Sequence, residues 1–493
     1  MKSIFRDKSI ATLVILSLIG LTVMYIETMV SPAIPDFIRD FKISYNVAPW
    51  ILTAYLVVAV VMTPIMGRLS DLYGRKRVLL IGLIIYAIGT FAAGFATNIY
   101  FMLIARAVEG VGIGIFPVAV AMVRNQSSEE KLAFNQGIIT SMFATGAVIG
   151  LAAGGMIIHY FGWRSTFFTI MPLVILLIIL VIRFIHDSNS ENIRNNGNYD
   201  DDDDDDDSSK ISTTNSKIDI KGALVFSIGI ISVLLIITNL EGKMSFANWF
   251  VIGSLSIIGC ISLISFAFIE NRIKSPLIDL KLIANKVLLS ANILRMIAGL
   301  FMFMILNTMP ILIRNPKPIG FGESSINTAS IIVPFMIAYL LIGVSSGFIL
   351  SRLGNIRVII IGSLICIVGF INLLFFFHNL VTLLSGLAIL GIGSQLLHQG
   401  AININLVSTP KNQTGISFGI SNVFYLMGSA IGPTIVGMYM QANQTSINGV
   451  IGSFPSSYSY ILIFETGVIL SLMTIIIDII VLNRVKEGRT TIL

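Results

Sequence analysis

The chain is organised as long apolar runs separated by short polar loops. Fourteen runs reach the roughly 20 residues that a helix needs to cross a bilayer. The pattern therefore predicts an all-α, polytopic membrane protein with fourteen transmembrane helices. The predicted spans are residues 10–31, 48–66, 78–96, 99–122, 137–159, 164–184, 221–240, 249–269, 287–313, 327–349, 357–377, 380–405, 416–440 and 459–482.

Basic residues mark one side of these spans. If the chain starts inside, the inner loops and tails hold 24 of the 32 Lys and Arg residues, the outer loops hold 6, and Arg106 and Arg295 lie within spans. Cytoplasmic loops are enriched in Lys and Arg, so we expect both termini in the cytoplasm and a multi-pass protein of the cell membrane. The net charge of +6 follows from this bias and does not indicate a nucleic-acid partner.

The polar segment 188–217 contains eight consecutive aspartates, Asp200 to Asp207. Like charges at this density repel one another and disfavour folding. We interpret the segment as a disordered cytoplasmic linker. Binding of divalent cations stays open as an alternative, but we assign no metal site to it.

The chain also contains an internal repeat. "GRLSDLYGRKRVLLIG" (67–82) returns as "GFILSRLGNIRVIIIG" (347–362), and "GAVIGLAAGG" (146–155) returns as "GSAIGPTIVG" (428–437). We therefore predict two six-helix bundles, 1–187 and 287–493, with two inserted transmembrane helices within 218–286. Two parallel copies are typical of one large class of secondary transporters, which bind substrate near the midplane between the halves.

These motifs resemble signatures of the major facilitator superfamily. "GRLSDLYGRKRVLL" is similar to its loop signature between helices 2 and 3, and "LIARAVEGVGIG" (103–114) is similar to its helix 4 signature. "GAVIGLAAGG" resembles the helix 5 antiporter signature, although Leu151 replaces the usual proline. "ETMVSPAIPDF" and "WILTAYLV" resemble helices 1 and 2 of the drug:proton antiporters. With two extra helices, the resemblance implies the fourteen-helix branch of these multidrug efflux proteins.

Three ionisable residues are candidates for proton and substrate coupling: Glu27, Arg106 and Glu109. Glu27 corresponds to Asn307 in the second copy, and Arg106 to Leu387, so this chemistry belongs to the first half. A Glu27 facing the central cavity could let a proton and a cationic substrate compete for one carboxylate. The alternative is a static ion pair with Arg106, or a glutamate that snorkels to the interface.

Glu109 lies three residues after Arg106, so both occupy one face of a helix. It could neutralise Arg106 as a structural lock or serve as a second proton site. In the second half, Asn307 and His398 are candidates for a polar site. His398 could equally be a hydrogen-bonded interior histidine.

The repeated loop supplies a candidate conformational latch, formed by Gly67, Asp71, Gly74, Arg75 and Lys76. The resemblance implies that Asp71 interacts with the start of a second-half helix when the inner side closes, and a carboxylate at a helix N-terminus is favourable. The alternative is a basic inner loop with one solvated acid.

Small residues let helices approach closely. The candidates for helix packing and gating are Gly146, Gly150, Gly154, Gly155, Gly432 and Pro433.

We therefore expect a transporter and not an enzyme. It would export small, amphipathic, cationic compounds in exchange for protons by alternating access. The sequence has no nucleotide-binding loop, so we expect no ATP dependence, and we expect no cofactor. The partners would be the substrate, protons and the lipid bilayer, with the chain a monomer. One alternative is a transporter of a specific metabolite on the same scaffold. Another is a non-transporting receptor or sensor, which the lack of a folded soluble domain disfavours.

Overall fold

The computed structural model describes residues 8–115, 118–119, 122, 129–185, 220–239, 246–273, 284–409, 414–448, 450 and 452–486. Its described elements are α-helices, apart from one 3-10 helix and one two-stranded hairpin. In chain order they are α1 (Lys8–Met29), η2 (Ser31–Ala33), α2 (Ile34–Phe41), α3 (Trp50–Tyr73), α4 (Arg75–Gly94), α5 (Ile99–Ile113), α7 (Glu129–Phe161), α8 (Trp163–Thr169), α9 (Met171–Phe184), α11 (Ile220–Asn239), α12 (Phe246–Glu270), α14 (Lys286–Arg314), α15 (Ser325–Leu353), α16 (Asn355–Phe376), α17 (Leu380–Ser408), α18 (Thr414–Ala442), β1 (Gln444–Ser446), β2 (Ser453–Pro455) and α19 (Ser457–Lys486).

Twelve helices in the described ranges are long and apolar enough to cross a membrane. They coincide with twelve of the fourteen predicted spans. The other two positions hold α5, whose described part has 15 residues, and α11, which contains a shorter apolar helix at Lys221–Ile237. The prediction of an all-helical polytopic membrane protein is confirmed. The predicted linker, 188–217, lies outside the described residues.

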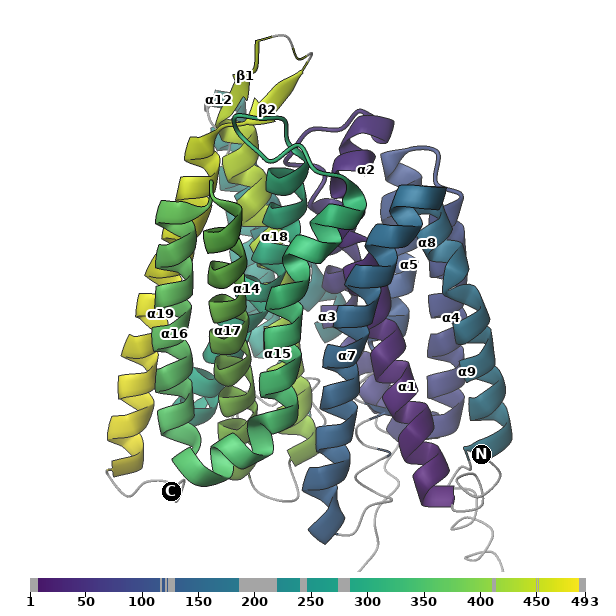
Figure 1. Cartoon of the computed structure of the whole chain (residues 1–493). Helices are drawn as coiled ribbons and strands as arrows, with labels where there is room; N and C mark the ends of the chain where they lie inside the picture. Colours follow the sequence, from purple (N-terminus) through teal and green to yellow (C-terminus); the bar gives the residue numbers. More distant parts are fainter. Residues whose placement is uncertain are drawn as a thin grey trace, which may run out of the picture.

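The helices form two bundles that stand side by side (Figure 1). In the first, α1 packs against α7 and α4 against α5. In the second, the equivalent helices make the same pairs: α14 packs against α18 and α16 against α17. Two seams join the bundles, one between α7 and α15 and the other between α3 and α18. The sequence repeat is therefore matched by a repeat in the packing.

The two helices between the repeats pack against each other, and α11 also contacts α3 and α18. In Figure 1, α12 lies behind the second bundle. Large apolar side chains of α12, such as Trp249, Phe250 and Ile264, are exposed. In a membrane protein such a surface faces lipid, so α12 lies at the periphery of the molecule.

Glycines allow the closest helix contacts. A Cβ atom at Gly146, Gly150 or Gly154 of α7 would lie within 3.0 Å of carbonyl oxygens of α1. The same holds for Gly428 and Gly432 of α18 against carbonyl oxygens of α14. The two signature segments thus pack their helices in the same way in both bundles. The remaining candidate of this group, Pro433, lies inside α18.

The repeated loop makes the same turn in both copies. Gly74, between α3 and α4, has φ 92°, and Gly354, between α15 and α16, has φ 77°. Residues other than glycine rarely adopt positive φ, because their Cβ collides with the backbone. The geometry of this helix–helix turn therefore requires the glycine at this position, Gly74 in the first copy and Gly354 in the second.

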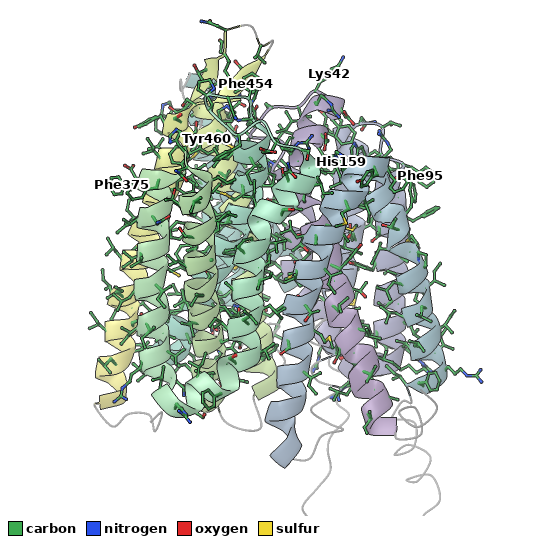
Figure 2. The ribbon with its side chains drawn as sticks, viewed as in Figure 1. Lys42, Phe95, His159, Phe375, Phe454 and Tyr460 are labelled. Atoms are coloured by element: carbon green, nitrogen blue, oxygen red, sulfur yellow. The ribbon has the colours of Figure 1, made fainter. Side chains whose placement is uncertain are left out.

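The two ends of the molecule differ. Helix α1 begins and α19 ends at the lower end in Figure 1, which we call the inner end. The opposite, outer end carries α2 and the β1–β2 hairpin, with Lys42, His159 and Phe454 nearby (Figure 2). Phe95 and Phe375 lie on the flanks (Figure 2) and are 57% and 68% exposed. Apolar flanks of this kind are suited to contact with lipid.

Candidate functional site

Two of the predicted coupling residues form an ion pair inside the first bundle. The Arg106 Nη1 atom donates to the Glu109 Oε2 atom at 2.6 Å, and both side chains are fully buried. Arg106 Nε also donates to the Ile51 carbonyl of α3 at 3.1 Å, and the Arg106 Cζ atom lies 4.0 Å from the ring centroid of Tyr55. Arg106 Nη2 has no partner in the described part. The arginine is thus held by α3 and by its own helix.

Glu27 lies beside this pair but does not join it directly. It is buried on α1, and it is close enough to interact electrostatically with Arg106 and Glu109. Glu27 and Arg106 do not form an ion pair, because the described contacts of the guanidinium are with Glu109, Ile51 and Tyr55. We call Glu27, Arg106 and Glu109 the acid–arginine cluster. It holds two acids and one cation, all of them buried.

A small cavity lies between the bundles, at the middle and inner levels of the spans. Its volume is about 60 Å³. The first bundle contributes mainly apolar atoms to it, and the second contributes almost all of its polar groups. The described lining residues are Met24, Phe143, Ala144, Ala147, Arg295, Met302, Tyr339, Gln395, His398, Gln399, Ile402, Phe418, Asn422 and Tyr425.

The described lining contains a cation and no carboxylate. Arg295 of α14 supplies the cation, and Glu27 lies outside the lining. Met24, which does line the cavity, precedes Glu27 by three residues, or about one turn of α1. Glu27 is not among the residues that line this cavity, so a Glu27 that faces the central cavity stays a prediction. Glu27 lies one turn farther toward the outer end.

One tyrosine connects the two regions. Tyr425 of α18 lines the cavity and is close enough to interact electrostatically with both Glu27 and Arg295. Its ring centroid lies 4.9 Å from that of His398. The acid–arginine cluster and the cavity are therefore neighbours across the interface between the bundles.

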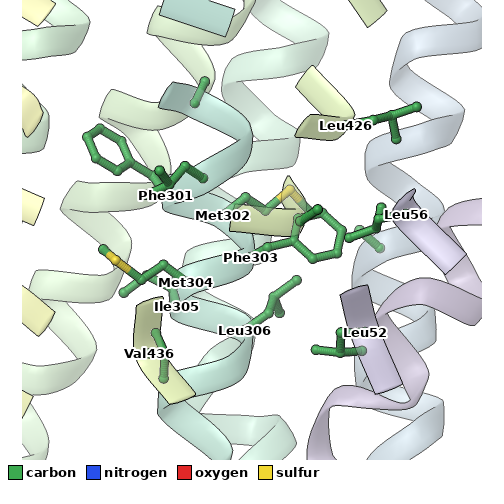
Figure 3. Packing of buried hydrophobic residues seen from close by; sticks show 14 of the residues in the cluster. Leu52, Leu56, Phe301, Met302, Phe303, Met304, Ile305, Leu306, Leu426 and Val436 are labelled. Carbon is green, nitrogen blue, oxygen red and sulfur yellow. The ribbon is translucent and has the colours of Figure 1, made fainter. Parts of the chain in front are cut away.

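The interface outward of the cavity is apolar and closely packed. Figure 3 shows Phe303 and Leu306 of α14 facing Leu52 and Leu56 of α3, whereas Phe301 points to the other side. All five side chains are buried. This packing separates the cavity from the outer end of the molecule.

Polar contacts close the outer end itself. The two terminal nitrogens of Arg314, at the end of α14, donate to the two carboxylate oxygens of Asp36 of α2, at 2.5 and 2.8 Å. Arg314 also donates to the Pro32 carbonyl at 3.2 Å. Ser31 donates to the Leu306 carbonyl, which again joins the two bundles. We call the Asp36–Arg314 pair the outer clamp.

The remaining predicted residues lie away from the cavity or outside the described part. Lys76 of the predicted latch donates to the Ile182 carbonyl of α9, within its own bundle, at 2.8 Å. Arg75 begins α4, and no described residue from another part of the chain lies within 4 Å of where a Cβ on Gly67 would be. The side chain of Asp71 lies outside the described residues, so the latch stays a prediction.

The other gating and second-half candidates occupy three different places. Gly155 of α7 faces α15, where Ser325 donates to its carbonyl at 3.4 Å. His398 lines the cavity, and its Nδ1 atom is buried without a hydrogen bond in the described part. Asn307 is buried on α14, and its side-chain amide has no partner among the described residues. Asn307 does not line the cavity.

Arg295 belongs to none of the motifs from which the candidate site residues were predicted. In the sequence it stands out only as a second arginine within a predicted span. Charged residues inside a membrane are costly and mark functional positions by default, so this was the available signal. Asn422 and Gln395, which also line the cavity, have no comparable signal, because an amide carries no charge.

The fold and the cavity together define a polytopic secondary transporter built from two related bundles. The chain belongs to the Major Facilitator Superfamily, whose sequence model matches residues 16–313 and 291–488. The family resemblance inferred from the loop and helix motifs is confirmed.

Several relatives have names that indicate transport. The multidrug transporter protein MdtP of Bacillus subtilis (strain 168) is 25% identical over 423 residues, covering 85% of this chain and 73% of the relative. The uridine/deoxyuridine transporter of Lactococcus lactis subsp. cremoris (strain MG1363) is 23% identical over 455 residues, covering 90% and 89%. The crystal structure of the nucleoside transporter NupG shares the fold, with a TM-score of 0.62, 13% identity and coverage of 96% and 100%.

Proposed function

We propose that this chain exports small amphipathic compounds across the cell membrane, as a monomer and in exchange for protons, by alternating access. The observation that carries the proposal is the acid–arginine cluster. Two carboxyl groups and one guanidinium are buried together, so the cluster is neutral when one proton is shared between Glu27 and Glu109. Loss of that proton leaves a net negative charge, which is unfavourable inside a bilayer.

The position of Tyr425 suggests how the proton and the substrate would influence each other. A ligand that moves Tyr425 in the cavity changes the surroundings of Glu27, because the two side chains lie close together. Proton binding at Glu27 acts on the cavity in the same way. Such mutual influence is the thermodynamic requirement for coupled transport, since linkage between two sites is reciprocal.

The lining of the cavity bears on the charge of the substrate. The expectation of cationic substrates depended on a Glu27 carboxylate in the cavity. The described lining has Arg295 and no acid, so the proposal of proton-coupled efflux does not include a cationic substrate. The relative MdtP, named as a multidrug transporter, supports the transport of more than one kind of compound.

The test uses purified protein in liposomes with an imposed pH gradient. Uptake of cationic, neutral and anionic fluorescent amphiphiles is measured, together with proton movement. We expect Glu27→Gln to abolish accumulation driven by the pH gradient, because glutamine keeps the size of the side chain but cannot exchange a proton. Exchange of labelled for unlabelled compound without a gradient should persist.

Glu465→Gln is the matched control, because Glu465 is an exposed acid on α19. It should behave as wild type. If Glu27→Gln retains wild-type gradient-driven accumulation, the proton site is not Glu27, and Glu109→Gln is tested next. If both variants retain it, the proposal fails.

A second candidate function is the transport of one polar metabolite. The polar groups of the cavity favour it, because side chains that can form hydrogen bonds with a ligand line it: Arg295, Gln395, His398 and Asn422. A relative named as a uridine/deoxyuridine transporter supports the same reading. Competition experiments separate the two functions. A multidrug exporter is inhibited by many unrelated amphiphiles, whereas a metabolite transporter is inhibited by close analogues of one compound.

A further inference from the structure

Arg295 is a buried cation with few partners. Its side chain is 3% exposed, yet its one hydrogen bond in the described part joins Nη2 to Asn422 Oδ1 at 3.3 Å. The Nε and Nη1 atoms have no partner among the described residues. No acid among the described residues pairs with Arg295, whereas Arg106 in the first bundle has Glu109. A guanidinium in a bilayer without a counter-ion is an expensive feature, which indicates a function.

Aromatic rings hold Arg295 in place without using its hydrogen-bond donors. The Arg295 Cζ atom lies 5.0 Å from the ring centroid of Phe418 and 5.6 Å from that of Tyr425. Such contacts stabilise a guanidinium through the face of the aromatic ring. They leave N–H groups at the edge of the guanidinium free. This edge is the part that binds a carboxylate or phosphate through two parallel hydrogen bonds.

Other groups around the cavity are also unsatisfied. The Nδ1 atom of His398 and the Oε1 atom of Gln395 are buried without partners in the described part, and both residues line the cavity with Arg295. Buried polar atoms normally have a hydrogen-bond partner. The second bundle therefore presents a guanidinium and further polar atoms to one small space. The apolar side of that space comes from Met24, Phe143 and their neighbours on the first bundle.

We propose that this cavity binds amphipathic substrates that carry an anionic head group, with the head group on Arg295. The anion would accept hydrogen bonds from the free edge of the guanidinium, and the apolar body would lie against Met24, Phe143 and Met302. This inference rests on the proposed export function and names the substrate class of the same cavity. The charge it assigns is opposite to the charge expected from Glu27.

Binding to the purified full chain in detergent tests the inference without a pH gradient. Three probes share one aromatic body: 2-naphthoate, its neutral amide, and the cationic 2-naphthylmethylammonium. Calorimetry or displacement of a bound dye gives their dissociation constants. We expect wild-type protein to bind the carboxylate at least about tenfold more tightly than the amide, since charge-assisted bidentate hydrogen bonds are the strong ones. We expect the cation to bind more weakly than the amide.

Arg295→Gln should remove the preference for the carboxylate over the amide. Arg295→Lys should retain part of it, because lysine keeps the charge but not the planar fork. Arg272→Gln is the matched control. Arg272 is also stacked on a phenylalanine, Phe268, at 4.0 Å, but it is exposed outside the cavity. Arg272→Gln should leave the dissociation constants of all three probes unchanged.

Wild-type binding that favours the cation, or equal binding of the carboxylate by folded Arg295→Gln and wild type, would overturn the inference. The wild-type comparison needs no variant, so it decides the point even if Arg295→Gln does not fold. Failure of the export proposal has a different signature. In that case the carboxylate preference depends on Arg295, but an imposed pH gradient drives no accumulation in liposomes.

Discussion

The outer clamp makes a quantitative prediction about the conformational equilibrium. Asp36 joins the two bundles by accepting two hydrogen bonds from Arg314, and both side chains are largely buried, 8% and 19% exposed. Asp36→Asn removes the charge and one of the two acceptors. Hydrogen bonds to charged groups contribute about 1.5–3 kcal/mol each to stability. A tenfold change in an equilibrium corresponds to about 1.4 kcal/mol, so losing one such bond should shift the balance toward an outward-open state by about 10–150-fold.

Distances between spin labels can measure this shift. Thr97 and His378 are exposed, and they follow α4 and α16, the equivalent helices of the two bundles, at the outer end. Labels at these positions report the separation of the bundles there. Cys260 is exposed and should be replaced by serine beforehand, whereas Cys366 is buried. We expect Asp36→Asn to populate a second, longer distance that wild type does not show.

Arg39→Gln is the control for this prediction. Arg39 also pairs with Asp36, at 3.2 Å, but its side chain is 70% exposed. Exposed ion pairs contribute about 0–1 kcal/mol, so its loss should change the distance distribution little. If Asp36→Asn gives the wild-type distribution, the clamp does not hold the outer end closed. If Arg39→Gln populates the longer distance as strongly as Asp36→Asn, the change in the distance distribution comes from general surface charge and not from the clamp.

Two other predictions concern packing and the latch. Gly150→Ala should lower the melting temperature of the purified protein, because a Cβ there would collide with the Tyr25 carbonyl. Gly253→Ala on α12 is the control and should leave the melting temperature unchanged, because no described residue from another part of the chain lies within 4 Å of that position. Equal melting temperatures for the two variants would contradict this view of the α1–α7 contact. Asp71→Asn should leave substrate affinity in detergent near wild type but slow turnover in liposomes, because an amide cannot supply the charge that favours a helix N-terminus. An unchanged turnover rate would refute the latch.

The sequence predicted the fold well because membrane insertion imposes a simple rule. Each spanning helix must satisfy its own backbone hydrogen bonds, so apolar length alone locates it. The Arg106–Glu109 pair was also predictable, since residues three apart share a helix face. The glycines shared by α7 and α18 predicted close helix packing. The positive φ of Gly74 and Gly354 explains why both copies of the loop have glycine at that position.

The arrangement across the bundles was not predictable in the same way. Whether Glu27 faces the cavity depends on the rotation of α1 about its axis and on how the two bundles meet. Neither the rotation of α1 nor the arrangement of the two bundles can be read from a single sequence. The cavity lining comes from α1, α7, α14, α15, α17 and α18, and its key cation, Arg295, belongs to no motif. The substrate charge was therefore inferred from Glu27, which the structure places one helical turn away from the lining.

The contacts of α11 have a consequence for how lipophilic compounds reach the cavity. Helix α11 packs against both α3 and α18, so it lies across one of the two seams between the bundles. A compound dissolved in the bilayer meets a wall on that face of the molecule. The seam between α7 and α15, at the front in Figure 1, is the one that α11 does not cover in the described part of the chain. Entry from the membrane would therefore be one-sided, although the two bundles that form the cavity are copies of one unit.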